Sequence, residues 1–563
     1  MVLVVLYTRK MRHFLKSMLS CFLEMLVLAA SAFVYALAFP NFLNVQGWGF
    51  LAFFAWIPVF RVINRATWKT VWFEGMAYGF GFYLVYNYWL KTFHPLAILL
   101  APTLESFQYV LLFLVLKLAG MVGEKRGYLV QSLVFVAYEY LTQQGFLAYP
   151  YGNMATAIWA YRPLIQIASI GGVWVICFLM ILPQAFLAQK HKEWSGYRVD
   201  IGLYLAVVFA SLLFGFASIA YYDAKVPKRV VRIAAVQHSA DSWKGGYETY
   251  KENYETLRGF SLEAMAGNPK PDMVLWSETA FVPSVSWHLA HPTDWRTRAL
   301  VDDFVNFGKT LGVPLITGNP EGLVKDETLP AVLRDGTWNW KTYNTVILFG
   351  QGRILGTYRK QHLVPFTEYF PYEKQFPRLY NLLVANDYKW WEPGTEATVF
   401  RYDGIDFSTP ICFEDIFGYL SAGFVKNGAD MLVNLTNDSW SGSVCAEMQH
   451  MSQAVFRAIE NRRPLIRGTN SGMTTMVDVT GRPCQTMEPF TKGWRLYEVP
   501  IGQKEGTTFY TLLPDFFGKL LLVLAVCALA GYGRSFFLVW SERRRYWKRW
   551  GHLFDALDEE MYE

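Results

Sequence analysis

The segment Thr409-Pro410-Ile411-Cys412-Phe413-Glu414-Asp415 places a cysteine and two carboxylates directly after a short apolar run. Its apolar part, together with the residues before it, is the predicted strand Phe407–Ile411, so Cys412 is expected at a strand end. Two other segments end in the same way, with a reactive side chain after an expected strand: Leu275-Trp276-Ser277-Glu278 and Tyr358-Arg359-Lys360-Gln361-His362. Strand ends are where α/β folds carry their sites, so the three segments predict both a fold class and an active site.

Glu278, Lys360 and Cys412 supply the three groups that acyl transfer through a thiol requires. A thiol is a strong nucleophile only as the thiolate, a carboxylate can remove its proton, and a lysine can stabilise the developing negative charge. Each residue also has a simpler interpretation: Cys412 as a small buried residue, Glu278 as a carboxylate near a helix N-terminus, and Lys360 as part of a basic run. Their order and local contexts together favour the catalytic interpretation.

The three segments belong to residues 226–505, where short apolar runs alternate with helical or polar stretches. This alternation predicts an α/β domain, and the number and spacing of the runs suit a sandwich of sheets with helices outside. The expected strands are Val230–Gln237, Met273–Trp276, Val313–Thr317, Thr345–Phe349, Phe407–Ile411, Met431–Thr436 and Thr474–Val477.

Outside this region the chain is dominated by apolar stretches near the roughly 20 residues that a helix needs to cross a bilayer. The 563 residues are 53% hydrophobic, with a mean hydropathy of +0.17, and include 21 Trp and 33 Tyr, whose rings gather at lipid–water interfaces. We expect an α-helical transmembrane bundle of about eight spans, and we interpret Leu96–Pro102 as a re-entrant or interfacial segment. The expected spans are Phe22–Pro40, Trp48–Ile63, Val71–Leu90, Leu104–Val122, Tyr128–Phe146, Leu164–Ala188, Ile201–Tyr222 and Phe516–Phe537.

Lysine and arginine residues decide the orientation, because short basic loops stay on the cytoplasmic side. They occur in the N-terminal segment and in every second loop, whereas the loops around Asn44, Lys91 and Arg162 are nearly free of them. We therefore expect residues 1–225 to form seven spans, residues 226–505 an extracytoplasmic catalytic domain, and residues 506–563 an eighth span with a cytoplasmic tail. The basic residues expected inside include Arg65, Lys69, Lys125, Arg126, Lys190, Lys192, Arg198, Arg543, Arg544, Arg545, Lys548 and Arg549.

The net charge of +6 and the six cysteines argue against other classes of protein. Basic residues cluster beside apolar runs and form no stripe along the α/β domain, so no nucleic-acid partner is expected. The cysteines show no CxxC pair and no metal-ligand spacing, so we expect no metal site and no disulfide framework, with a single Cys445–Cys484 bridge as the open alternative. The chemistry proposed for Cys412 requires no diffusible cofactor.

Several short motifs resemble those of the apolipoprotein N-acyltransferases, a membrane-embedded branch of the nitrilase superfamily. That superfamily uses a Glu, Lys, Cys triad in this chain order on an αββα sandwich. The resemblance covers nearly the whole chain, and the run from His362 to Glu368 is its most specific element. The motifs are Tyr343-Asn344-Thr345, Lys360-x-His362-Leu363-Val364-Pro365-Phe366-x-Glu368, Cys412-Phe413-Glu414, Thr436-Asn437-Asp438-x-Trp440 and Arg467-x-Thr469-Asn470-x-Gly472.

The resemblance implies a bacterial inner-membrane enzyme with its catalytic domain facing the periplasm. It would take an acyl chain from a membrane phospholipid and transfer it to the α-amino group of the S-diacylglyceryl cysteine at a lipoprotein N-terminus. The implied reaction is ping-pong: Cys412 attacks the ester, a lysophospholipid leaves, and the lipoprotein amine resolves the thioester. Glu278 would act as general base and then acid, and Lys360 would help to hold the oxyanion.

The same resemblance implies roles for the residues around the triad. Glu368 would polarise or orient Lys360, and Glu414 and Phe413 would support the pocket beside the thiol. Trp243 would lie in a mobile arm near the acyl chain. The residues expected to bind substrate are Trp243, Asn344, Asn437 and Trp440.

Three positions depart from the family pattern, and two other functions compete with the acyltransferase interpretation. Phe413 lacks the hydroxyl of the aromatic residue that commonly follows the nucleophile, Thr367 stands where Gly is common, and Ser441 replaces an aromatic residue. These departures concern loop geometry and acyl preference more than reaction class.

The main alternative is a membrane-anchored nitrilase-type amidase, for which seven spans are excessive. A transporter is disfavoured because the sequence shows no inverted repeat.

Overall fold

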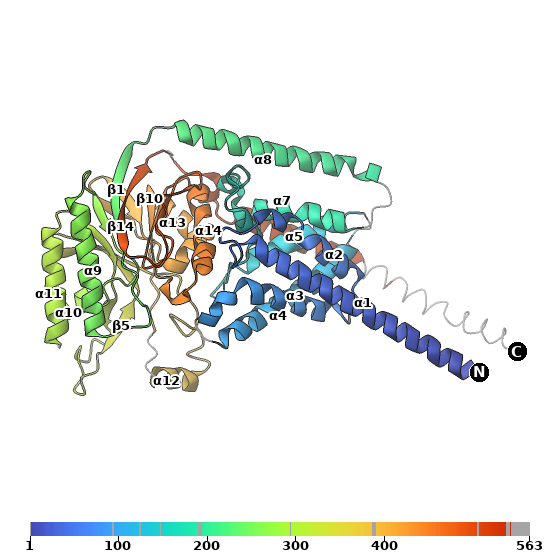
Figure 1. Cartoon of the computed structure of the whole chain (residues 1–563), viewed down its shortest axis with the longest axis horizontal. Helices are drawn as coiled ribbons and strands as arrows, with labels where there is room; N and C mark the ends of the chain where they lie inside the picture. The colour runs from blue at the N-terminus through green and yellow to red at the C-terminus, as the bar shows by residue number, and fades with distance from the viewer. Residues whose placement is uncertain are drawn as a thin grey trace.

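The computed structural model consists of a helical bundle packed end-on against an α/β domain (Figure 1). It describes residues 2–92, 95–122, 125–146, 148–189, 194–292, 294–385, 390–503, 506–535 and 541. An N-terminal helical region and an α/β domain were both expected and are confirmed. Of the basic residues expected inside, seven lie outside the described residues: Lys190, Lys192, Arg543, Arg544, Arg545, Lys548 and Arg549.

Five segments of the described chain are helical, long and apolar enough to cross a membrane, rather than the eight expected. They are Met18–Ala38 in α1 (Val2–Ala38), α4 (Ala97–Met121), α7 (Ala168–Ala188), Trp194–Ala224 around α8 (Arg198–Ala224), and the C-terminal helix Phe516–Ser535. Shorter helices pack against these five. The shorter helices are α2 (Trp56–Arg65), α3 (Val71–Tyr86), α5 (Gly127–Leu141) and α6 (Arg162–Ile165).

Two predicted segments of the bundle have different boundaries in the structure. The stretch Trp48–Ile63 is not one helix, because a 3-10 turn at Gly49–Phe53 precedes α2. Pro58 falls in the first turn of α2, where its missing N–H costs no helical hydrogen bond. The expected re-entrant segment Leu96–Pro102 is instead the beginning of α4, which continues through Pro102. The Thr103 hydroxyl donates to the Leu99 carbonyl (2.7 Å), the kind of bond that supports a helix around a proline.

Two six-stranded sheets form the α/β domain. One has the order β14-β1-β2-β3-β6-β7 and the other the order β13-β12-β11-β10-β9-β8, with a separate hairpin of β4 and β5. The strands are β1 (Arg229–Gln237), β2 (Met273–Leu275), β3 (Leu315–Gly318), β4 (Glu321–Val324), β5 (Trp340–Tyr343), β6 (Thr345–Gly350), β7 (Arg353–Arg359), β8 (Phe400–Tyr402), β9 (Ile405–Ser408), β10 (Met431–Thr436), β11 (Leu465–Thr469), β12 (Thr475–Val477), β13 (Pro483–Cys484) and β14 (Gly493–Ile501).

The seven expected strands all correspond to observed ones, with one boundary clearly misplaced. The strand expected at Phe407–Ile411 ends at Ser408, and Ile411 forms only an isolated bridge to Leu435. Pro410 explains the early end, because it lacks the N–H that a central strand requires. β11 and β14 were not among the expected strands, and the strand expected before Lys360, which is β7, had been given no bounds.

The sheets face each other, and helices cover their outer faces. In β1, Ile233 and Ala235 point into the core shared with the second sheet, whereas Ala234 and Val236 point toward the outer helices. Those helices are α9 (Tyr247–Ala266) and α11 (Trp295–Thr310), at the left of Figure 1. On the opposite side, α13 (Gly418–Lys426) and α14 (Val444–Asn461) lie between the second sheet and the bundle (Figure 1). The order of layers is therefore αββα, as the nitrilase resemblance implies.

Buried polar contacts join α14 to the bundle. The Gln449 side-chain amide donates to the carbonyls of Pro40 (2.9 Å) and Tyr86 (3.1 Å). The Cys445 thiol donates to the same Pro40 carbonyl (3.1 Å). All six cysteines are free, so the alternative of a Cys445–Cys484 bridge is wrong. The two thiols belong to different surroundings, since Cys445 is buried against the bundle and Cys484 lies in the edge strand β13.

Candidate active site

Four strand ends converge at one edge of the sandwich, and a predicted site residue follows each of them. β2 is parallel to β1 and β3, and it precedes Glu278. β9 is parallel to β10, and these two strands precede Cys412 and Asn437. β7 is antiparallel to β6, which is antiparallel to β3, so β7 runs in the same direction as β3 and brings Lys360 to the same edge. Parallel strands thus assemble side chains that are far apart in the sequence.

The carboxylates of Glu278 and Glu368 flank the Lys360 ammonium. Nζ of Lys360 lies 2.8 Å from Oε1 of Glu368 and 3.5 Å from Oε1 of Glu278, and the lysine side chain is only 1% exposed. The Asn344 amide donates to both carboxylates, at 2.8 Å to Glu278 and 3.1 Å to Glu368. The other Glu278 oxygen accepts from the Asn437 backbone N–H (3.0 Å). Each of these side chains therefore makes at least two polar contacts within the site.

Cys412 stands at the first position of a 3-10 turn, Cys412–Ile416, where its backbone has a φ of 49°. Few residues other than glycine adopt this left-handed conformation, and those that do are frequent at functional sites. The Asn434 amide donates to the carbonyls of Pro410 (3.2 Å) and Cys412 (3.3 Å) and so fixes both sides of the turn. These contacts fix the backbone that carries the thiol.

The carboxylate of Glu414 joins the nucleophile turn to the segment that carries Lys360. It accepts from the backbone N–H of Ile411 (2.8 Å) and from those of Gln361 (2.7 Å) and His362 (3.0 Å). The Tyr358 hydroxyl donates to it as well (2.9 Å). With these lone pairs occupied, Glu414 is suited to hold the pocket and not to move protons.

Burial and neighbouring charges shift the titration of the three central groups. Burial raises the pKa of Glu278 above its usual range, against the opposing effect of the Lys360 ammonium and of hydrogen bonds with Asn344 and Cys412. Burial also raises the pKa of the Cys412 thiol, and the Glu278 carboxylate raises it further. Burial alone would lower the pKa of Lys360, but Glu368 and Glu278 outweigh it and raise that pKa. The resting site therefore holds a neutral thiol beside a carboxylate of increased basicity and a permanent cation.

Further predicted residues lie around this cluster. Phe413 is buried, and its ring stacks on that of Tyr151 from the bundle (6.4 Å between centroids). Trp440 packs against Trp89 of the bundle at 5.6 Å. Trp243 is 62% exposed on the loop after β1.

Asn344 and Asn437, both predicted to bind substrate, use their polar groups within the protein. The Asn344 amide lies between two carboxylates, as described above. The Asn437 side chain accepts from the Asn470 amide (3.0 Å) and the Ser242 hydroxyl (2.9 Å). These contacts favour a positioning function for both residues.

Sequence reasoning missed a second buried cluster, formed by Asp415, Asp438, His450 and Arg467. The His450 imidazole lies 3.0 Å from Asp438 through Nδ1 and 3.0 Å from Asp415 through Nε2. The Arg467 guanidinium donates to Asp415, and its second nitrogen lies 3.7 Å from Asp438. The available signal was the presence of charged residues in otherwise apolar stretches, because a buried charge must find a partner.

Among the described residues no group of three or more His, Cys, Asp or Glu side chains is arranged to hold a metal ion. Nothing in the geometry of the site calls for one, since a base, a thiol and a cation are already together.

Comparison with known proteins matches both parts of the chain. Residues 31–186 match the apolipoprotein N-acyltransferase N-terminal domain, and residues 232–505 match the carbon-nitrogen hydrolase family. Apolipoprotein N-acyltransferase 1 of Treponema denticola is 37% identical over 524 residues, which is 90% of this chain and 96% of the relative. The protein of the same name from Treponema pallidum is 37% identical over 502 residues, 85% of this chain and 90% of the relative.

A relative from another genus, apolipoprotein N-acyltransferase of Borreliella burgdorferi, is 28% identical over 514 residues, 88% of this chain and 93% of the relative. These similarities span the bundle as well as the α/β domain. The chain therefore belongs to the apolipoprotein N-acyltransferase family, which comprises acyltransferases of the nitrilase, or carbon-nitrogen hydrolase, superfamily.

Proposed function

We propose that this protein transfers an acyl chain from a membrane phospholipid to the α-amino group of the S-diacylglyceryl cysteine at the N-terminus of a lipoprotein. The observation that carries the proposal is the meeting of the buried Glu278 and Lys360 with the half-buried Cys412 at the end of an apolar helical bundle. Cys412 packs with Phe413 and Phe417 in an apolar cluster. Such surroundings suit a lipid chain and exclude the water that would hydrolyse a thioester.

The first half-reaction forms an acyl-enzyme. Glu278 accepts the thiol proton of Cys412, and Sγ attacks the ester carbonyl of the phospholipid. The Lys360 ammonium stabilises the oxyanion of the tetrahedral intermediate. When this intermediate collapses, the carbon–oxygen bond of the ester breaks, and Glu278 returns its proton to the departing alkoxide. A lysophospholipid leaves, and the acyl chain remains on Cys412 as a thioester.

The second half-reaction uses the same groups, but Cys412 is now the leaving group and the lipoprotein amine is the nucleophile. The lipoprotein α-amine attacks the thioester carbonyl, and Lys360 again faces the oxyanion. Glu278 takes a proton from the attacking nitrogen as the carbon–nitrogen bond forms. The carbon–sulfur bond then breaks, and this proton returns to Sγ of Cys412. Glu278 thus acts as base and acid once in each half-reaction.

The surrounding residues hold these catalytic groups in position. Glu368 and Asn344 orient Lys360 and Glu278, and Glu414 fixes the nucleophile turn. Trp243 and Trp440 are proposed to contact the lipid parts of the substrates. Trp440 is the better supported of these two, because its ring lies on Trp89 where the bundle meets the α/β domain.

We also propose eight membrane crossings, with α2, α3 and α5 counted among them. Three chain segments of the bundle meet the α/β domain. Pro40 after α1 and Tyr86 at the end of α3 both accept from Gln449, and Gln166 before α7 accepts from Arg462 (2.6 Å). The helices between these points therefore have to leave the α/β domain and return to it.

Other contacts gather at the opposite end of the bundle. Asn64 in α2 accepts from Gln131 in α5 (2.8 Å), and Arg126 before α5 pairs with Asp200 in α8 (3.1 Å). Figure 1 shows the N-terminus of α1 at this same end, away from the α/β domain. Alternation between the two ends supports seven crossings before residue 226, and the C-terminal helix adds the eighth.

This topology puts the α/β domain on the periplasmic face of a bacterial inner membrane, because the basic loops are retained inside. Reporter fusions near Asp335 are expected to read external, and fusions at Lys192 and Arg549 cytoplasmic. An internal reading at Asp335 would contradict the orientation and remove the lipoprotein acceptor from reach.

The function is tested with purified protein in phospholipid vesicles and a synthetic peptide that carries an N-terminal S-diacylglyceryl cysteine. We expect an amide-linked acyl group on the peptide and an equal amount of lysophospholipid. A peptide with an acetylated N-terminus is the matched control and should accept nothing. Release of free fatty acid with no acylated peptide would instead identify an amidase that transfers the acyl group to water.

A further inference from the structure

A cavity of about 410 Å³ lies within the bundle, between α4, α5 and the C-terminal helix Phe516–Ser535. Its volume falls within the range of small-molecule sites. Leu111, Leu141 and Val526 contribute to its lining and are each more than half exposed. Leu111 and Val526 belong to helices long enough to cross a membrane, and Leu141 belongs to α5, which is proposed to cross as well. The exposed side of the cavity is therefore expected to face lipid.

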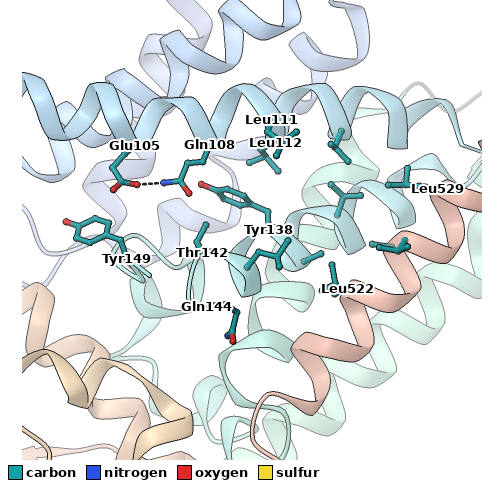
Figure 2. Close-up of a pocket in the computed structure, with 16 residues that line it drawn as sticks. Glu105, Gln108, Leu111, Leu112, Tyr138, Thr142, Gln144, Tyr149, Leu522 and Leu529 are labelled. Carbon is teal, nitrogen blue, oxygen red and sulfur yellow. Dashed lines mark hydrogen bonds between the residues drawn. The ribbon is translucent and has the colours of Figure 1, made fainter. Parts of the chain in front are cut away.

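The cavity lining changes from polar to apolar along its length (Figure 2). Glu105, Gln108 and Tyr149 lie toward one end, where the Gln108 amide donates to the Glu105 carboxylate. Leu522 and Leu529 of the C-terminal helix lie toward the other end. This gradient fits an amphiphile whose polar part stays at the first end and whose chain extends past the second.

The polar end leads to the nucleophile through aromatic rings. Tyr149 lines the cavity and stacks on Tyr151 (5.0 Å between centroids), and Tyr151 stacks on Phe413 (6.4 Å), the neighbour of Cys412. Ala148, from the same loop after α5, belongs to the apolar cluster against which Cys412 packs. One loop therefore borders both the cavity and the nucleophile.

We propose that this cavity holds the acyl chain that is being transferred and that the C-terminal helix sets the chain length accepted there. The proposal rests on the proposed function and names the donor phospholipid chain as the occupant. Leu522, Ala525, Val526 and Leu529 form one face of the C-terminal helix, with the i, i+3, i+4, i+7 spacing of neighbours on a helix surface. Ala525 is the smallest of them and is 3% exposed, so it determines how far a chain extends along this wall.

Selection in this cavity depends on shape. A lipid chain gains little from leaving the bilayer for an apolar cavity, because lipid tails are as apolar as leucine. A chain that is too long, in contrast, meets the side chains at the far end and displaces its own carbonyl from Cys412. A bulky residue in the wall should therefore change which chain reacts and leave binding to the membrane unaffected.

The test measures the chain-length distribution of the acyl-enzyme on the full-length protein. Vesicles contain equal amounts of phosphatidylglycerols with short, medium and long saturated chains, and no acceptor peptide is added. Ala525→Phe narrows the cavity, and Leu529→Ala lengthens it. Leu524→Phe is the matched control, because Leu524 lies on the same helix, does not line the cavity and is 44% exposed.

We expect Ala525→Phe to lower the ratio of long to short chains on Cys412 by about tenfold, the lower end of the discrimination that one methylene produces in an apolar pocket. Leu529→Ala should raise the ratio, and Leu524→Phe should leave it unchanged. If Ala525→Phe does not fold, the increase in the ratio of long to short chains expected for Leu529→Ala still tests the proposal. The proposal would be overturned if Ala525→Phe and Leu529→Ala formed a normal total amount of adduct with the wild-type ratio of long to short chains.

Two further outcomes separate this inference from the proposed function. An unchanged adduct distribution, combined with an altered preference for the chains of the acceptor peptide, would assign the cavity to the acceptor and contradict the donor assignment. If the wild-type protein forms no acyl adduct on Cys412 with any chain, the proposed function itself fails, and the cavity's role as a site for the transferred chain fails with it.

Discussion

The cluster around Lys360 and the cluster around His450 are both buried beside the nucleophile turn, but their charges are balanced differently. The Lys360 cluster combines one cation with the two carboxylates of Glu278 and Glu368. In the His450 cluster, burial alone would lower the pKa of His450, but the two neighbouring aspartates outweigh it and raise that pKa to about 9. At neutral pH its two cations therefore match its two carboxylates.

We infer from this difference that the Lys360 cluster can exchange protons, whereas the His450 cluster stabilises the fold. In a balanced network each charge already has its counterion, so no proton is available for exchange without a large penalty. In the Lys360 cluster one carboxylate exceeds the cations, and burial makes Glu278 a better proton acceptor. Substitutions in the two clusters test this distinction.

Removing the charge of Glu278 or of Lys360, the two groups proposed to be catalytic, should prevent acyl-enzyme formation while the protein stays folded. We expect Glu278→Gln to slow adduct formation by roughly 10²–10⁴-fold and Lys360→Met to slow it on the order of 10²–10³-fold. Adduct formation and thermal stability are measured for both single variants and the double variant. A structural ion pair would behave differently: both singles would lose stability, and recovery of activity in the double variant would refute the catalytic assignment.

Breaking the His450 cluster should affect stability first. His450→Gln leaves an uncompensated buried carboxylate, for which we expect a loss of about 3–5 kcal/mol. Thermal unfolding in detergent micelles measures this loss. The double variant His450→Gln with Asp438→Asn removes one charge of each sign and should recover part of the stability. A fully stable His450→Gln protein with no adduct formation would place His450 among the catalytic groups and erase the distinction between the clusters.

The same histidine predicts a loss of stability at alkaline pH. The pKa of His450 is raised on folding, so its contribution is fully present below the unfolded value of about 6.5 and is lost as pH rises through about 9. The contribution is on the order of 3 kcal/mol, because each tenfold gain in proton affinity corresponds to about 1.36 kcal/mol. Unfolding temperature measured between about pH 7 and pH 10 should fall more steeply for wild type than for His450→Gln. Parallel curves for the two proteins would contradict the assignment of a protonated imidazole.

The smallest effects are expected for the two other thiols of the α/β domain. Cys445→Ala removes one hydrogen bond to the Pro40 carbonyl and should cost about 1 kcal/mol. Cys484→Ala, in an edge strand, should cost less. Both variants should form the acyl-enzyme at the wild-type rate in the adduct assay. A severe loss of adduct in either one would show that a second thiol takes part.

The sequence predicted that Glu278, Lys360 and Cys412 lie together, but it did not predict the network that holds them. The three residues follow strands, and parallel strands bring their ends to one edge, so this proximity was predictable from local pattern, whereas their catalytic roles stay a proposal. The contacts of Asn344 with two carboxylates and of Glu414 with three backbone N–H groups were not predictable, because most of them join segments that lie far apart in the sequence.

The bundle was harder to delimit, because hydropathy records the apolar character of a stretch and not where its helix begins. Trp48–Ile63 is apolar except for Arg61, but a 3-10 turn occupies its first part. Leu96–Pro102 looked too short to cross and ended in a proline, yet it is continuous with α4. The His450 cluster was missed because its four members come from four separate elements, and only the folded chain shows that their charges are paired.

The central claim, a thioester on Cys412, is tested most directly by mass spectrometry of the purified protein after incubation with phospholipid alone. We expect one acyl mass on the peptide that contains Cys412, released by neutral hydroxylamine, with lysophospholipid formed in equal amount. Cys412→Ala should stay folded and carry no such mass. An acyl adduct on any other residue, or continued acyl transfer by Cys412→Ala, would contradict the account.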